Sequence, residues 1–368
     1  MNATFRLLAG CCSLLLAACA AVATTERMPP AQRPAVEVVE RYVSAEFRGE
    51  ELDSLAVWPA AEGRTWLIAS GKTTHRLHVF DADSGALLRT VGAQGNGPGQ
   101  FRRPNGLAVA GDLLFVVERD NQRVQVLRLP QFAPVTTFGS GSLRSPYGIW
   151  LLQASPDTLN AYVTDSFMDG ERHDVLPPLP QLAQRVRRFD LTLEQGGEVI
   201  RVHESGAFGD TSAESALRMV ESIAGDPQRE RLLIADEATA DAHGPRESTL
   251  REYTLDGRAT GRSAAAGSFA AEAEGVALWQ CGAHDGYWIA VDQLQPLTIF
   301  RVFGRDDLAL RGSFQGKRTA FTDGIALQAR SSAFPHGALF AVHDDKAVSA
   351  FDLGDVARAL HLSPACVR

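Results

Sequence analysis

Two glutamates stand two residues apart in Glu272-Ala273-Glu274-Gly275, directly before the apolar run 276–279 (VALW). In an extended chain, residues i and i+2 project to the same side, so both carboxylates would point into one small space. Like charges at that distance are unfavourable unless a cation lies between them. The pattern therefore indicates either a cation site or a pair of solvated turn residues.

Three further acids stand in a similar place, directly before a short apolar run: Asp53, Glu221 and Asp323. Taken alone, each is most simply a solvated turn residue, because acids are common at the ends of strands. Taken together, they offer the hard carboxylate oxygens that Ca²⁺ prefers, whereas zinc would call for the His and Cys that these positions lack. The set predicts a calcium site if the fold brings these segments together.

The chain repeats one pattern of short apolar runs separated by polar turns. The repeats are 56–81, 106–129, 148–191, 222–255, 275–303 and 324–353. Their starts are 42 to 74 residues apart, which approaches the roughly 40–50 residues of propeller repeats once insertions are allowed. The runs are rich in Val, Ile, Leu, Phe and Tyr and end at Gly, Asp, Asn or Pro, as strands do. A helical period is sustained only at 212–220 and 354–361.

These features predict a single all-β domain, a six-bladed β-propeller over residues 46–355. An α/β fold is excluded because crossover helices are missing, whereas an array of two-sheet sandwiches is compatible with the strand spacing. The innermost strand of each propeller blade begins at one mouth of the central channel. The acids that precede the apolar runs would therefore converge at that mouth. The insertion at 166–184 is expected to overhang one mouth of the channel.

The N-terminus has the features of an exported chain. Residues 1–18 carry one arginine and then an apolar stretch, as in a removed signal peptide. The run Leu16-Ala17-Ala18-Cys19 resembles a bacterial lipobox, which predicts lipidation of Cys19 and anchoring in the cell envelope, most simply at the outer membrane. Residues 19–45, rich in Ala and Pro, are expected to form a flexible tether, and residues 356–368 a C-terminal tail.

Composition narrows the possible partners. The 368 residues carry a net charge of −8, and an acidic chain lacks the basic face that nucleic acid requires. After removal of the signal and lipidation, two of the five cysteines remain, Cys281 and Cys366. In an oxidising envelope they would be able to form a disulfide, or they could equally be two buried thiols.

Two resemblances to known families add to these predictions. The segment 92–126 has a G-x-G-x-G-Q-F turn, a Pro-x-Gly and an N-x-R-V-Q-V strand, and it is similar to an NHL propeller repeat. A wider set of motifs lies in order between residues 50 and 360. They are DSLAVW (53–58), ASGK (69–72), VER (117–119), ESIAGD (221–226), LIADE (233–237), EAEGV (272–276), GYWIAVDQ (286–293) and TDGI (322–325). Together they resemble the β-propeller phytases, calcium-dependent enzymes that hydrolyse inositol hexakisphosphate.

The phytase resemblance implies a role for each matching residue. The candidate calcium ligands are Asp53, Glu221, Glu237, Glu272, Glu274, Gln293 and Asp323. Lys72 and Arg119 would hold substrate phosphates, and with Glu221 they form the implied catalytic set. Clustered Ca²⁺ would neutralise the anionic ester, polarise its P–O bond and activate a water. The implied partner is a phosphorylated small molecule such as an inositol phosphate, bound by a monomer.

Several positions depart from the phytase pattern. Ser54 and Leu55 replace an acid and a proline, Leu152 a tyrosine and Ser166 a phosphate-binding lysine. Lys317 lies in a segment, 315–318, where the family has further acids, and a cation there cannot coordinate a metal.

Two function hypotheses follow. The first is a calcium-dependent phosphomonoester hydrolase of the phytase type at the cell envelope. The alternative is an inactive propeller lipoprotein that acts as an NHL-like binding or scaffolding module. A lactone-hydrolysing propeller is disfavoured because no Asn and His complement accompanies the acids.

Overall fold

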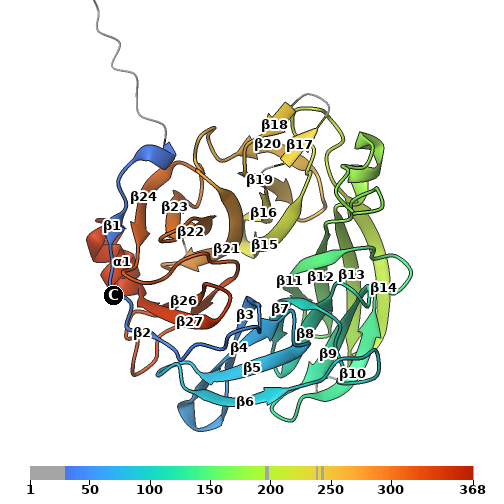
Figure 1. Cartoon of the computed structure of the whole chain (residues 1–368), viewed down its shortest axis with the longest axis horizontal. Helices are drawn as coiled ribbons and strands as arrows, with labels where there is room; N and C mark the ends of the chain where they lie inside the picture. The colour runs from blue at the N-terminus through green and yellow to red at the C-terminus, as the bar shows by residue number, and fades with distance from the viewer. Residues whose placement is uncertain (1–29, 195–198, 238, 242–243, 283, 368) are drawn as a thin grey trace, which may run out of the picture.

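The computed structural model of the chain describes residues 30–194, 199–237, 239–241, 244–282 and 284–367. Six sheets follow one another in chain order around a central axis (Figure 1), which confirms the six-bladed β-propeller. The four strands of blade one are antiparallel and follow one another in chain order, joined by short turns. The predicted signal peptide, the lipobox and Cys19 lie outside the described residues.

The first three blades each have four strands. Blade one comprises β3 (Leu52–Pro59), β4 (Thr65–Gly71), β5 (Arg76–Asp81) and β6 (Leu87–Val91). Blade two comprises β7 (Pro104–Ala110), β8 (Leu113–Glu118), β9 (Arg123–Arg128) and β10 (Ala133–Phe138). Blade three comprises β11 (Pro146–Ser155), β12 (Thr158–Asp165), β13 (Val186–Leu193) and β14 (Val199–Phe208).

The last three blades vary this plan. Blade four comprises β15 (Val220–Asp226), β16 (Arg231–Asp236), β19 (Thr249–Thr254) and β20 (Ala259–Ser263), with a small hairpin of β17 (Thr239–Asp241) and β18 (Gly244–Arg246) between them. Blade five comprises β21 (Glu272–Gln280), β22 (Gly286–Gln293), β23 (Ile299–Gly304) and β24 (Leu310–Gln315). Blade six takes only β25 (Ile325–Gln328), β26 (Ala338–His343) and β27 (Ala347–Asp352) from its own repeat.

The N-terminal segment completes the propeller. Strand β2 (Tyr42–Val43) pairs antiparallel with β27 and forms the fourth strand of blade six, while β1 (Val36–Glu37) pairs parallel with β24. The Glu40 carboxylate accepts hydrogen bonds from the backbone N–H groups of residues 317–319. The predicted tether, residues 19–45, therefore extends too far toward the C-terminus. Its last residues pair with strand edges of blades five and six that would otherwise be unpaired.

The C-terminal segment is packed rather than a free tail. Helix α1 (Leu353–Ala359), expected from the period at 354–361, begins at Asp352, whose carboxylate caps the N–H groups of residues 354 and 355. A disulfide joins Cys281 of blade five to Cys366, and both cysteines are buried. The helix expected at 212–220 is absent, because the carboxylate of Asp236 takes the N–H groups of residues 218 and 219 and β15 begins at Val220. The described 3₁₀ turns are 30–32, 61–63, 179–184, 227–229 and 364–367.

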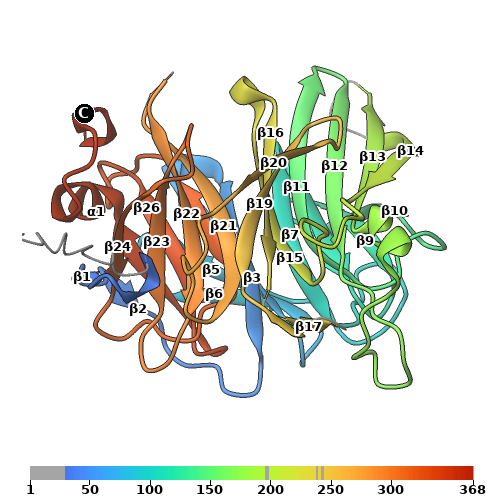
Figure 2. The same cartoon turned by 90° about the horizontal axis from the view of Figure 1, so that it is seen from above.

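The core is divided among the contacts between blades. Each of six hydrophobic clusters draws buried side chains from two neighbouring blades, as where Ile68 and Val79 of blade one pack with Leu114 and Val116 of blade two. Figure 2 shows the blades from the side, packed face to face around the ring. Because each sheet buries both faces, its central strands are almost continuously apolar, as in the fully buried Leu113–Glu118 strand β8.

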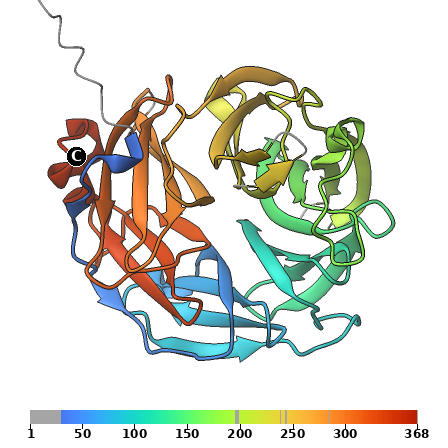
Figure 3. The same ribbon diagram turned by 45° about the horizontal axis from the view of Figure 1, so that its top comes forward.

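The six innermost strands face the centre of the ring (Figure 3) and line a channel of about 500 Å³ with small and apolar residues. In the part of the chain that the structure describes, no helix has the length and apolar character needed to cross a membrane.

Candidate metal and phosphate site

A ring of polar side chains marks the start of the innermost strands, one from each blade. The ring residues are Asp53, Asn105, Tyr147, Glu221, Glu274 and Asp323. In five blades the pairing register between the first and second strands shifts at this residue, and in blade six it lies two residues before β25. Such irregularities re-aim a side chain. Here they place six polar groups at one mouth of the channel.

A small residue follows each ring residue and allows the backbones of neighbouring blades to lie close together. An added Cβ at Gly324 would lie 2.4 Å from the carbonyl oxygen of Asp53, and one at Gly275 would lie 2.7 Å from that of Asp323. The N–H of Gly324 donates to the Asp53 carbonyl at 3.0 Å, and the N–H of Gly275 donates to the Asp323 carbonyl at 2.8 Å. Backbone hydrogen bonds thus join neighbouring ring positions directly.

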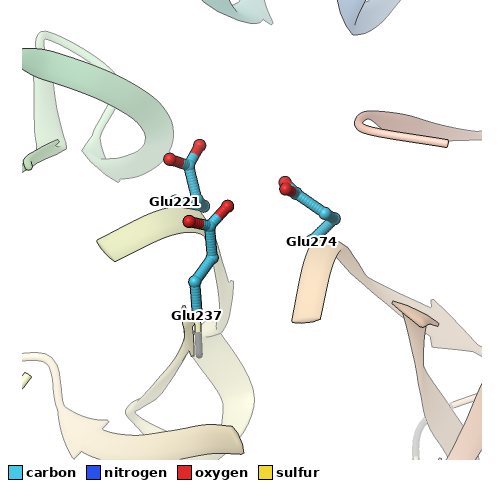
Figure 4. A group of neighbouring side chains, drawn as sticks. All are labelled: Glu221, Glu237 and Glu274. Atoms are coloured by element: carbon cyan, nitrogen blue, oxygen red, sulfur yellow. The ribbon is translucent and has the colours of Figure 1, made fainter. Parts of the chain in front are cut away.

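Three glutamates form a compact group on one side of the ring. Glu221 and Glu237 come from blade four, Glu237 directly after β16, and Glu274 comes from blade five. One carboxylate oxygen from each lies within 4.8 Å of the others, and Figure 4 shows the three carboxylates facing one another. Among the described residues, this is the only group of three His, Cys, Asp or Glu side chains that meets this distance.

The electrostatics of the three glutamates favour a cation. Burial, and then the neighbouring carboxylates, raise the pKa of Glu221 and Glu274 well above the usual value. Burial raises the pKa of Glu237 to about 7, although a hydrogen bond with Glu274 opposes the shift. Glu221 Oε2 is buried without a hydrogen-bond partner. Three hard oxygen donors held together in this way fit Ca²⁺, which would remove the repulsion between them.

Lys72 balances the negative charge on the side of the ring opposite the three glutamates. Its Nζ lies 3.6 Å from Asp53 Oδ2 and 3.4 Å from Asp323 Oδ2. Burial alone would lower the pKa of Lys72, but four carboxylates, foremost Asp53 and Asp323, raise it above the usual value. Burial raises the pKa of both Asp53 and Asp323 to about 6, while Lys72 opposes these shifts. Gln293 Nε2 donates to Asp323 Oδ1 at 2.6 Å. The structure thus joins Lys72, which the resemblance assigned to substrate, to two acids of the ring.

Two ring residues have no counterpart among the sequence predictions. The Tyr147 hydroxyl hydrogen-bonds the Asp53 carboxylate, and burial followed by the charge of Asp53 raises the pKa of Tyr147 well above its usual value. Asn105 is fully buried, and both polar atoms of its amide lack a partner. The signal for both was present in the sequence: P-N-G-L (104–107) and P-Y-G-I (146–149) share the form of T-D-G-I (322–325).

The structure does not bring all the predicted ligands into one group: Asp53 and Asp323 pair with Lys72, and Glu272 stands apart. Its side chain is exposed, whereas that of Glu274 is only 5% exposed. The expectation that both point into one space is wrong, because the register of β21 shifts after Ala273 and interrupts the strand alternation. Glu272 remains close enough for its charge to raise the pKa of Glu237.

A pocket of about 760 Å³ opens beside the three glutamates, between blades two, three and four. Glu221 and Tyr147 line its inner end, and Arg119 lines the side formed by blade two. The insertion after β12 supplies another wall, including residues 166–168, 172 and 173, so it lies at this mouth as expected. Arg119 Nε pairs with Asp120 Oδ1 at 2.7 Å, and both side chains are partly exposed. The pocket is thus acidic at its inner end and carries arginines along its walls.

Fold and site together define a six-bladed β-propeller with a polar ring and a carboxylate group at one channel mouth. The NHL repeat model matches residues 101–127, which overlap the segment 92–126 that resembles this repeat. No curated protein sequence matches the chain.

Solved structures with the same fold are distant in sequence. A gluconolactonase from Xanthomonas campestris is similar over 88% of this chain and 96% of its own, with 15% identity and a TM-score of 0.52. A virginiamycin B lyase from Staphylococcus aureus is similar over 83% of this chain and 86% of its own, with 9% identity and a TM-score of 0.47. At 15% identity, the similarity to the gluconolactonase shows the fold alone, and the activity has to be inferred from the residues of the site.

Proposed function

We propose that the chain is a calcium-dependent hydrolase that removes phosphate from phosphate monoesters of the phytate type. The observation that carries the proposal is the position of the three glutamates, which lie close together and one of which, Glu221, lines the inner end of a pocket with arginine walls. A phosphate ester is anionic, so a site for it needs cations, and carboxylates alone would repel it. Calcium held by the glutamates and guanidinium groups on the walls would meet this requirement together.

The residues that would hold Ca²⁺ are Glu221, Glu237 and Glu274. Asp323, whose charge raises the pKa of Glu237 and Glu274, and Gln293, which is hydrogen-bonded to Asp323, are further candidates. Bound calcium would neutralise the phosphate and activate a water for attack on phosphorus.

The remaining polar residues would contact the substrate or balance the charge of the ring. The Arg119 guanidinium can hold a phosphate through a fork of two N–H groups, since its partner Asp120 is exposed. Tyr147 lines the same pocket and carries a hydroxyl hydrogen-bonded to Asp53. Lys72 balances the charge of Asp53 and Asp323, which lets these acids remain ionised beside the glutamates.

The direct test uses the soluble chain from residue 24 onward. Release of inorganic phosphate from phytate is measured with calcium and with a chelator, and thermal unfolding is followed under the same conditions. Calcium-dependent release together with thermal stabilisation is the expected result. Absence of both refutes the enzyme proposal, whereas stabilisation without release favours the propeller as a binding module.

A second candidate, hydrolysis of a lactone, is supported by Asn105. Its amide lies in the ring, fully buried, with both polar atoms unpartnered, so it offers an uncharged oxygen ligand or a donor beside the acids. The similarity in fold to a gluconolactonase is consistent with this candidate but too distant to establish it. An assay of the same protein with an aldonolactone, which measures the acid that is released, distinguishes the two activities.

We also propose export and lipid anchoring through Cys19. The disulfide between Cys281 and Cys366 supports an oxidising compartment, because disulfides persist outside the reducing cytosol. A Cys19→Ala variant expressed in bacteria is expected to leave the membrane fraction; its retention there would contradict the proposed anchor.

A further inference from the structure

Two methionines line the pocket beside the glutamates: Met168 belongs to the insertion, and Met219 directly precedes β15. The chain has four methionines, and these two are the only ones in the part of the chain that the structure describes. Neither is part of the six hydrophobic clusters, and both are partly exposed. Core packing therefore does not account for them, whereas exposed methionines are typical of surfaces that bind apolar ligands.

The sulfur of Met168 is held by a buried arginine. Arg185 is fully buried, and its Nη2 donates to Met168 Sδ at 3.7 Å. The Nη1 of Arg185 donates to the carbonyl oxygens of Asp165 and Phe167 at 3.0 and 2.6 Å, which fixes the guanidinium. Phe167 lines the same pocket but is only 2% exposed, so it supports the wall rather than contacting a ligand. The Met168 side chain is thus ordered before any ligand binds.

Met219 lies directly beside the glutamate group. Its N–H donates to Asp236 Oδ1 at 2.9 Å, and its carbonyl oxygen accepts the N–H of Glu237 at 2.9 Å. It also precedes Glu221 by two residues. A molecule bound at the glutamates would therefore pass Met219 as it extends from the inner end of the pocket.

Tyr147 adds an aromatic ring to this surface. It lines the inner end of the same pocket and is partly exposed. Its hydroxyl hydrogen-bonds the Asp53 carboxylate, which limits the positions open to the side chain. Aromatic rings make favourable contacts both with thioether sulfurs and with other aromatic rings. Two thioethers and a phenol ring in one pocket are therefore suited to a flat aromatic group.

We propose that Met168, Met219 and Tyr147 bind an aromatic group of the substrate, so that the pocket takes phosphate monoesters of aromatic alcohols as well as polyol phosphates. The inference rests on the proposed function, since it places the phosphate at the glutamate end of this pocket. Hydrolysis of such an ester joins a water oxygen to phosphorus and breaks the bond between phosphorus and the phenol oxygen. The phenol leaves with the electron pair of that bond and takes up a proton from the water.

The experiment measures equilibrium binding of phenylphosphonate and methylphosphonate by calorimetry, with calcium kept below the level that precipitates either ligand. Both ligands carry the same phosphonate group on a carbon atom and resist hydrolysis, so the aromatic ring is what distinguishes them. The proteins are the wild type, Met168→Gln, Met219→Gln and Met168→Leu. Leu88→Gln is the control, because Leu88 is an apolar side chain that is 47% exposed on β6, the outer strand of blade one.

Partial burial of a phenyl ring predicts roughly ten-fold tighter binding of phenylphosphonate than of methylphosphonate by the wild type. Each glutamine variant should reduce this preference roughly three-fold or more, because glutamine brings a polar amide to the wall. Met168→Leu and Leu88→Gln should keep the preference. A wild type that binds both ligands equally, or binds neither, overturns the inference without any variant, and so does a preference that both glutamine variants retain. Thermal unfolding of each variant shows whether it is folded.

Release of phosphate from phenyl phosphate and from phytate is measured separately on the wild type. A preference for phenylphosphonate without release from either ester refutes the proposed hydrolase and leaves the aromatic site standing. Release from phytate without a preference for phenylphosphonate refutes the aromatic site and leaves the hydrolase standing.

Discussion

Glu237→Gln should make the calcium-free protein more stable at alkaline pH while removing its response to calcium. The substitution keeps the size of the side chain and removes a charge that burial makes unfavourable. Burial raises the folded-state pKa of Glu237 from 4.5 to about 7. A raised carboxyl pKa means that the folded protein holds this proton more tightly than the unfolded chain does. The stability that the proton confers is complete below about pH 4.5 and is lost as the pH rises through about 7.

The magnitude follows from the size of that shift. At about 1.4 kcal/mol per pKa unit, ionisation of Glu237 costs the calcium-free wild type up to about 3 kcal/mol at pH 8. Glutamine does not ionise, so the variant avoids this loss. For a domain of this size, the difference corresponds to roughly 4 °C in Tm. Calcium at a hundred times its Kd would stabilise the wild type by about 2.7 kcal/mol and the variant by much less.

The assay is thermal unfolding of wild type and Glu237→Gln at pH 5 and pH 8, each with chelator and with calcium. Glu62→Gln serves as the control, because the Glu62 side chain is 81% exposed in a turn of blade one. The Tm difference between variant and wild type should be largest at pH 8 with chelator and should shrink to nearly zero when calcium is added at a hundred times its Kd. Identical pH profiles in chelator, or equal stabilisation of both proteins by calcium, would refute the reasoning.

Three further outcomes are expected. Glu274→Gln should abolish calcium stabilisation and phosphate release, whereas Glu272→Gln should retain both because its side chain is exposed. If both variants change the calcium-dependent Tm equally, the two glutamates belong to one calcium site and this prediction is wrong. Gly324→Ala should cost about 1–3 kcal/mol in denaturant unfolding, because its Cβ would lie 2.4 Å from a carbonyl oxygen of the next blade, and an unchanged midpoint would contradict the close approach. The pair Cys281→Ser and Cys366→Ser should lower stability by about 2–4 kcal/mol, a loss that reductant should reproduce in the wild type.

The repeat pattern was sufficient to predict the propeller, because each blade needs only short apolar runs and turns at a regular spacing. It could not predict the closure of blade six by β2, whose two residues Tyr42–Val43 are too short to carry any period. The predicted helix at 212–220 was wrong for a related reason: hydrogen bonds to Asp236, which is distant in the sequence, determine the backbone there.

The sequence was sufficient to predict the charged residues of the site but not the residues whose position depends on strand register or on alignment of the blades. Glu221, Glu274 and Asp323 were found by their position before apolar runs, and the structure brings them to one mouth as expected. Glu272 was placed with them because alternation was assumed to continue through a strand that in fact shifts register. Asn105 was overlooked because an uncharged residue before a glycine carries no chemical signal until the other blades are aligned with it.

The pairing of Lys72 with Asp323 joins the first blade to the last, across 251 residues of sequence. During synthesis the chain would produce Lys72 long before Asp323, so this pair can form only after the last blade has emerged and the ring has closed. The same holds for the backbone hydrogen bond between Gly324 and Asp53. A nascent or C-terminally truncated chain would therefore keep the blade four glutamates but lack the complete ring.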